Sequence, residues 1–202
     1  MRRQLSFVLT TSLLIFCSLP SVLAQTNGTN GRKAAAHASP LNISLPRKDG
    51  SVKFAVIGDT GTGGSKQQEV GATLLRSHQM FPFELVLMLG DNLYGGESAK
   101  DYRAKFSDVY QQLLDSKVKF YATLGNHDEP AQRFYENFNM EGKEYYRFTK
   151  GNVAFYSLNS NYMDKKQVDW LSSELAKDTS KWKILFCHHP PYSSGAKHGS
   201  DK

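Results

Sequence analysis

The chain has 202 residues, a length that fits one domain with additional segments. Its formal charge of +6 is concentrated near the N-terminus: residues 1–24 hold two arginines and residues 25–49 carry +3, which leaves +1 for residues 50–202. A balanced charge without a basic block argues against nucleic-acid binding, so no nucleic-acid partner is expected.

The N-terminus has the pattern of an export signal. Arg2 and Arg3 precede an apolar stretch, residues 7–19, that is too short to cross a bilayer. Small residues at 22–24 then fit a cleavage site. We therefore predict a signal peptide over residues 1–24, a mature chain without a membrane segment, and a secreted or periplasmic location. An uncleaved anchor is the alternative, and the choice between the general and twin-arginine export routes stays open.

Residues 25–49 predict a flexible linker, because Asn, Gly, Thr, Ala, Ser and Pro dominate them without a hydrophobic period. From residue 50 onward, apolar runs alternate with amphipathic segments. The runs predict strands at 52–57, 84–89, 118–124 and 183–187, and the segments predict helices at 65–78, 98–114, near 131–138 and from Asp164. Ser65 with Gln68, three residues later, resembles a capping box.

The segments 145–148 and 153–158 flank a Lys-Gly-Asn turn and predict an antiparallel hairpin. Strands that alternate with helices predict an α/β fold, and the hairpin predicts a mixed sheet.

Four of the predicted strands lead into side chains of the types that bind metal ions in proteins: Asp59, Asp91, Asn126 and His188. In open α/β sheets, ligands bind outside the carboxyl ends of the strands. Carboxylate, carboxamide and imidazole groups suit two divalent or trivalent cations better than one tetrahedral zinc ion. An aspartate that bridges two metals about 3.5–4 Å apart forms a site that clamps a phosphoryl group.

Together these segments resemble the calcineurin-like metallophosphoesterases. The similarity rests on Gly58-Asp59-Thr60-Gly61, Gly90-Asp91-Asn92-Leu93-Tyr94, Gly125-Asn126-His127-Asp128 and the His188 that precedes His189-Pro190. Tyr94 makes the chain similar to the purple acid phosphatases, especially their small, tartrate-resistant type. The resemblance covers about residues 50–202 and implies a sandwich of two mixed sheets flanked by helices.

The resemblance also implies a metal-binding role for five residues. Asp59 is similar to a ligand of the first metal, Asp91 to the bridging ligand, Tyr94 to a tyrosinate on the first metal, and Asn126 and His188 to ligands of the second. Most of the superfamily has a histidine where this chain has Gly61, and a Tyr94 phenolate fills that gap. A hard anionic oxygen suits ferric iron, so the implied cofactors are Fe(III) and a divalent Fe, Zn or Mn ion. A packing role is the alternative for Tyr94.

Three further residues resemble catalytic groups. His127 is similar to a histidine near the leaving group, Asp128 would orient it, and His198 resembles a histidine that contacts substrate and protonates the leaving oxygen. A solvated loop histidine is the alternative for His198. His189 is expected either to support the metal ligands from behind or to line the pocket. The implied activity is that of an acid-phosphatase-like phosphomonoesterase, which hydrolyses small phosphate esters with a metal-activated water.

The family's last motif, Gly-His-x-His, supplies one ligand to each metal and is expected a few tens of residues after His198, whereas the sequence ends at Lys202. We therefore expect a domain over 50–202 that is truncated before this motif, and a fragment that can be inactive by itself. Phosphodiesterase or nucleotidase activity is an alternative, as is a non-catalytic phosphate-binding domain if the truncation is natural.

Overall fold

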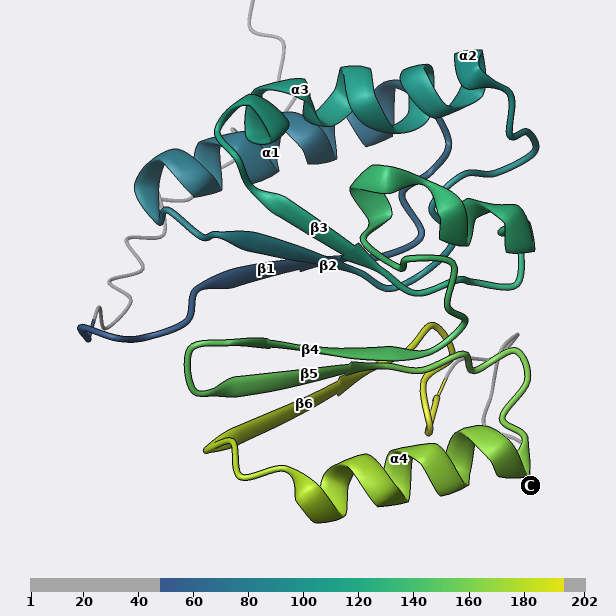
Figure 1. The fold of residues 1–202 in the computed structure, drawn as a ribbon. Coiled ribbons are helices and arrows are strands. Elements are labelled where there is room, and N and C mark those ends of the chain that lie inside the picture. The colour runs from purple at the N-terminus through teal and green to yellow at the C-terminus, as the bar shows by residue number, and fades with distance from the viewer. Residues whose placement is uncertain (1–47, 195–202) are drawn as a thin grey trace, which may run out of the picture. The chain divides into compact units, whose positions relative to one another are not determined.

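The computed structural model describes residues 48–194, which form two three-stranded sheets with helices outside them (Figure 1). The predicted signal peptide, nearly all of the predicted linker and His198 lie outside the described residues. Within residues 48–194, no helix combines the length and apolar composition that a membrane crossing requires.

The first half of the domain contains β1 (Phe54–Ile57), α1 (Ser65–Met80), β2 (Leu85–Met88), α2 (Ala99–Tyr102), the π-helical η1 (Arg103–Ser107), α3 (Asp108–Asp115) and β3 (Lys119–Ala122). The second half contains the 3-10 helices η2 (Pro130–Phe134) and η3 (Glu136–Phe138), followed by β4 (Tyr146–Lys150), β5 (Val153–Ser157), α4 (Lys165–Lys177) and β6 (Trp182–Phe186).

The first sheet has the order β1-β2-β3 and is parallel throughout. Each strand is joined to the next by a helical crossover, the usual way to connect parallel neighbours. The register pairs Ile57 with Met88 and Met88 with Ala122, so the three strands end level with one another. The loops that follow them therefore leave the same edge of the sheet.

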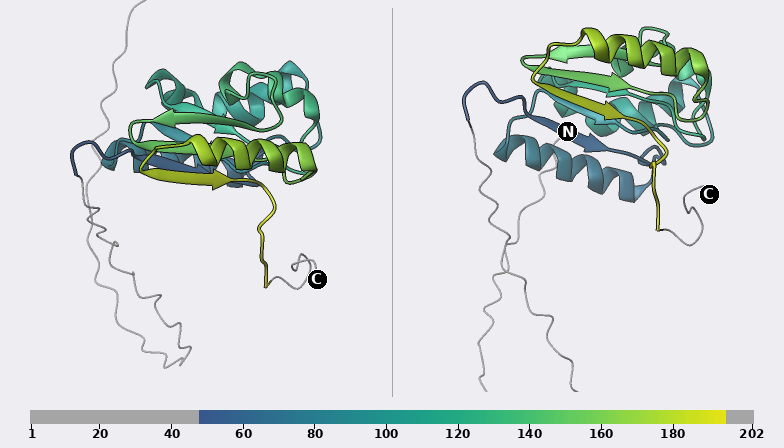
Figure 2. Two further views of the ribbon diagram at one scale, coloured as in Figure 1. Left: turned by 60° about the horizontal axis from the view of Figure 1, so that its bottom comes forward. Right: turned by 90° about the horizontal axis from the view of Figure 1, so that it is seen from below.

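The second sheet contains the mixed pairing that the sequence predicts. β4 and β5 form the antiparallel hairpin, and β6 pairs parallel with β5. The two sheets face each other, with α1 and α3 outside the first sheet and α4 outside the second (Figures 1 and 2). Mixed pairing was expected for both sheets, but the first sheet is parallel because every link within it is a helical crossover.

Aromatic side chains fill the space between the layers. Between the sheets, Tyr121 stacks on Phe148 with ring centroids 3.7 Å apart, and Phe54 meets Phe155 edge to face at 5.3 Å. Beneath the helices, Phe106 is fully buried. Its ring contacts those of Tyr102, Tyr110, Phe120 and Phe138. The aromatics of the segment 98–114 therefore belong to the core.

The helix starts agree only in part with the sequence patterns. The capping box predicted at Ser65 is wrong, because α1 has Gly64 as its N-cap and no side-chain cap. Asp164 does cap α4, where its carboxylate accepts a hydrogen bond from the Gln167 N–H. A capping box instead opens α2, where Ser98 and Asp101 exchange hydrogen bonds.

Candidate metal centre

Three loops converge at the edge of the first sheet, and glycines permit their close approach. Asp59 and Asp91 follow β1 and β2 with φ of 56° and 52°, a left-handed conformation that is uncommon outside glycine. A Cβ at Gly125 would lie 2.2 Å from Asp91 Oδ1, and one at Gly90 would lie 2.8 Å from His188 Nδ1. A side chain at either glycine would force the loops apart.

The polar residues that follow the strands lie together. Ligand-type atoms of Asp59, Asp91 and His188 are all within 4.8 Å of one another. Asp91 is buried, His188 is half-buried and Asp59 is exposed. Asn126 joins the group through its Oδ1 atom, which lies 2.9 Å from His188 Nε2. The arrangement brings two carboxylates, one carboxamide and one imidazole to a single rim.

The hydrogen bonds of His188 leave its Nε2 atom facing oxygen atoms. Its Nδ1 donates to the Leu89 carbonyl at 2.9 Å, because a carbonyl oxygen can only accept. In a neutral ring Nε2 then carries a lone pair, and it lies 2.9 Å from Asn126 Oδ1 and 3.6 Å from Asp91 Oδ1. The Nε2 lone pair and these oxygen atoms then repel each other. A proton on Nε2, a rotated Asn126 amide or a cation between the groups relieves this repulsion. A ring whose other N–H is held by a carbonyl is the usual form of a metal ligand.

Tyr94 binds Asp91 through its hydroxyl group. The hydroxyl donates to Asp91 Oδ2 at 2.7 Å, and the ring packs against His127 with centroids 5.2 Å apart. Burial raises the pKa of Tyr94 well above its ordinary value of 10, and the hydrogen bond to Asp91 and the nearby carboxylates raise it further. Tyr94 is therefore a phenol when no cation is near. Coordination as a phenolate requires a strongly charged ion such as ferric iron to displace the proton.

The backbone at Gly61 leaves no room for the histidine found there in most of the superfamily. A Cβ at Gly61 would lie 2.1 Å from the Asn92 carbonyl oxygen. The Gly61 N–H donates to the Asp91 carbonyl at 3.1 Å, and its own carbonyl accepts from the Tyr94 N–H at 2.9 Å. These bonds join the first two loops and bring Tyr94 to the side of Asp91.

Asp128 holds the second and third loops together. Its Oδ1 accepts from the N–H groups of Asn92 and Leu93 at 2.7 and 3.0 Å, and its Oδ2 accepts from the Gly125 N–H at 2.8 Å and Asn92 Nδ2 at 2.9 Å. Burial raises the pKa of Asp128, and the backbone N–H groups oppose that rise. A fixed carboxylate with four donors is a structural clamp.

Asp128 was expected to orient the His127 ring, but no hydrogen bond joins the two among the described residues. The Asp128 oxygens accept instead from the backbones of Asn92, Leu93 and Gly125 and from the Asn92 side chain. His127 is exposed and packs on Tyr94, and its backbone N–H donates to Asp91 Oδ1 at 3.1 Å.

Sequence reasoning also missed Asn92, whose buried side chain donates to the Thr123 carbonyl as well as to Asp128. Its place between Asp91 and Tyr94 was the signal available.

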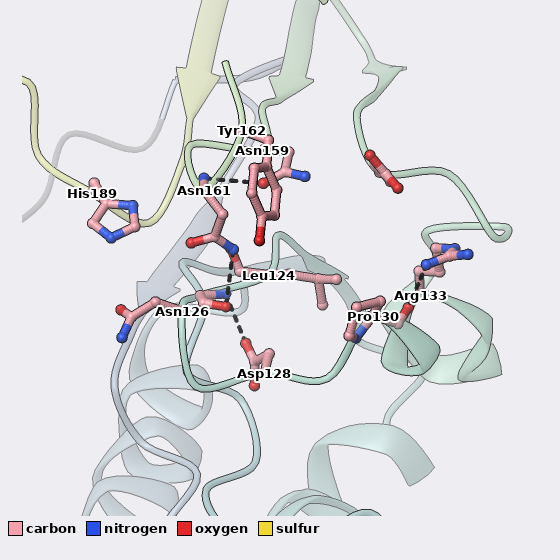
Figure 3. Close-up of a pocket in the computed structure, with 11 residues that line it drawn as sticks. Leu124, Asn126, Asp128, Pro130, Arg133, Asn159, Asn161, Tyr162 and His189 are labelled. Atoms are coloured by element: carbon pink, nitrogen blue, oxygen red, sulfur yellow. Dashed lines mark hydrogen bonds between the residues drawn. The ribbon is translucent and has the colours of Figure 1, made fainter. Parts of the chain in front are cut away.

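A pocket of about 420 Å³ opens beside Asn126 (Figure 3). His189 lines it, as expected, and is held by Ser160, whose Oγ lies 3.0 Å from both the His189 Nδ1 and its backbone nitrogen. The pocket therefore adjoins the metal-type residues through Asn126, which lines the pocket and contacts His188.

The fold and this site define a metallophosphoesterase-type domain. Residues 52–202 match the calcineurin-like phosphoesterase family, and the chain belongs to that family. The resemblance drawn from the four motifs is thereby confirmed.

The relatives extend this result. Purple acid phosphatase 17 of Arabidopsis thaliana is 25% identical over 238 residues, which cover 100% of this chain and 67% of that protein. GAP50, described as the anchor in the inner membrane complex of Plasmodium, has a similar structure with a TM-score of 0.57 and 21% identity, over 73% of this chain and 57% of that one. The structure of purple acid phosphatase PPD1 from yellow lupin (Lupinus luteus) seeds is similar with a TM-score of 0.52 and 18% identity. The match covers 75% of this chain and 34% of that one. The two structures show a shared fold, and the chain spans about a third to two thirds of the length of these proteins.

Replacing Asp128 with asparagine tests the clamp. The amide keeps the shape, but its NH₂ group must face N–H donors, so the variant loses at least two charge-assisted hydrogen bonds. We expect the free energy of unfolding to fall by about 3 kcal/mol, measured by urea denaturation. Asp169→Asn is the matched control: it breaks an exposed pair with Lys165 and should change stability by less than about 0.5 kcal/mol. Equal stability of both variants would contradict the clamp.

Proposed function

We propose that this protein is a metal-dependent phosphomonoesterase of the acid-phosphatase type, which hydrolyses small phosphate esters. The observation that carries the proposal is the cluster of acceptor atoms from Asp59, Asp91, Asn126 and His188 at one edge of the parallel sheet. Family membership and the similarity to a plant purple acid phosphatase support it. We also propose export through the signal peptide at residues 1–24, which the sequence pattern supports.

The residues present fit a pair of metal ions. Asp59, Asp91 and Tyr94 would hold one ion, and Asp91, Asn126 and His188 would contribute to the second. The hydrogen bonds of His188 support this assignment most specifically. Its Nδ1 is bound to the Leu89 carbonyl, and its Nε2 faces the Asn126 and Asp91 oxygens. Fe(III) with a divalent Fe, Zn or Mn ion would polarise the phosphate and supply a nucleophile from water.

The chain's own residues contribute position and protons. Asp91 is buried and its Oδ1 accepts from the His127 N–H, so its carboxylate is held at the rim where it would bind metal. The exposed ring of His127 stands beside Tyr94 at the loop end, where it can donate a proton to the leaving oxygen. His198 is the second candidate for that role, on the similarity of its sequence position.

Asp91→Ala should remove the bridging carboxylate and with it both metal content and hydrolysis. We expect p-nitrophenyl phosphate turnover to fall by more than about 100-fold, because even partners of metal ligands contribute 10- to 100-fold. Metal analysis, circular dichroism and steady-state kinetics are measured together, with Asp169→Asn as the folded, active control. A full-length protein that binds metals tightly yet hydrolyses no phosphate monoester would refute the proposed function.

Tyr94→Phe tests the iron assignment. Only a hydroxyl is removed, so the variant should fold and lose any visible absorption that arises from charge transfer between tyrosinate and ferric iron. The measurement is the visible spectrum of the iron-loaded wild type and variant. A colourless wild type at full iron occupancy would refute the assignment of Tyr94 as an iron ligand.

His127→Ala and His198→Ala identify the proton donor. Neither residue is proposed to hold metal, so metal content should stay near that of the wild type. Loss of the true acid should lower kcat on alkyl phosphates by about 10²–10⁴-fold, and far less on nitrophenyl phosphate, whose leaving group needs no proton. Equal losses on both substrates for both variants would leave neither histidine as the acid.

A further inference from the structure

The pocket beside Asn126 has the size and composition of a site for a small organic group (Figure 3). Its volume of about 420 Å³ falls in the range that accommodates such ligands. Asn126 and His189 lie at one end, and Pro130 and Arg133 lie at the other (Figure 3). A phosphate held at the proposed metal centre would therefore have the pocket beside it for the rest of the molecule.

Tyr162 presents an uncovered aromatic ring to this pocket. Its side chain is 78% exposed, yet its backbone is fixed, because its carbonyl accepts from the Asp164 N–H at 3.0 Å and from Gln167 Nε2 at 3.2 Å. Gln167 is buried and also exchanges hydrogen bonds with the backbone of Asn159 at 2.7 and 3.0 Å. The loop is rigid where the ring is attached, so the ring face is available without a rearrangement.

Arg133 supplies hydrogen-bond donors at the end of the pocket opposite Asn126 (Figure 3). Its Nη1 donates to the Pro130 carbonyl at 2.9 Å, and the guanidinium lies 4.8 Å from the Phe134 ring. Within residues 48–194 it forms no ion pair with a carboxylate, so its other N–H groups remain for a ligand. Glu144 also lines the pocket and offers an acceptor. The polar rim thus carries both donors and acceptors around an aromatic face.

We propose that this pocket binds a flat aromatic group of the substrate, stacked on Tyr162 with its polar edge toward Arg133 and Glu144; the proposal rests on the phosphomonoesterase function above. A small alkyl alcohol would leave the Tyr162 face and the Arg133 guanidinium uncovered, whereas an aromatic group with polar substituents covers both. The preferred substrates are then aryl phosphates or nucleoside monophosphates, and Tyr162 determines that preference.

Binding of two probes without phosphate tests the pocket independently of metals and of hydrolysis. The purified protein is titrated with adenosine and with N-acetyltyrosinamide by calorimetry. At least one should bind, and Tyr162→Ala should weaken that binding by about tenfold, the scale of one aromatic stacking contact. Tyr162→Phe should bind as the wild type does. The probe that binds tells whether a nucleoside or an aryl group is the natural occupant.

Tyr192→Ala is the matched control, because Tyr192 is 88% exposed and is not among the pocket-lining residues. It should bind both probes as the wild type does. In the metal-loaded protein, Tyr162→Ala should also lower the ratio of kcat/KM for phenyl phosphate to that for glycerol phosphate by about tenfold.

Failure of both probes to bind, or unchanged binding in Tyr162→Ala, overturns the pocket assignment. Hydrolysis of glycerol phosphate by the same metal-loaded preparation then decides the phosphomonoesterase function separately. A protein that binds a probe through Tyr162 but hydrolyses no ester refutes the function alone.

Discussion

The close approach of three backbone loops at the carboxyl edge of the parallel sheet is the constraint on which the site depends. Positions 61, 90 and 125 lie so near neighbouring atoms that no Cβ fits, and each is a glycine. Three hydrogen bonds from Asn92 and Leu93 to the Asp128 carboxylate hold two of these loops together, and a fourth from the Gly125 N–H fixes that carboxylate within its own loop. The level ends of the three strands make this approach possible, because they deliver the loops to one edge.

That geometry brings together groups that repel one another. Two aspartates, the Nε2 atom of His188 and the Asn126 oxygen share a rim, and among the described residues the donors to these carboxylates are the Tyr94 hydroxyl and the His127 N–H, which both bind Asp91. A cation is the group that satisfies all of them at once, since carboxylate and imidazole ligands are then drawn to a common charge. The close packing of the loops and the proposed metal binding thus both follow from the convergence of three loops at one sheet edge.

Sequence patterns predicted the element types and the residues at the strand ends, because an apolar run followed by a glycine and a polar ligand is a local signal. They failed where the outcome depends on distant atoms. Asp128 contacts Asn92 and Gly125 rather than His127, which only the folded loops determine. Ser65 does not cap α1, since Gly64 takes that place. Tyr162 belongs to no motif, and its role follows from a pocket assembled by residues from 124 to 189.

Anomalous diffraction from a crystal of the protein grown with manganese would locate the metal ions relative to these loops. We expect an anomalous peak in direct contact with an Asp91 oxygen and with His188 Nε2, while His188 Nδ1 still donates to the Leu89 carbonyl. Manganese found only at other sites, with His188 Nε2 still in contact with Asn126, would contradict a metal centre built by these loops.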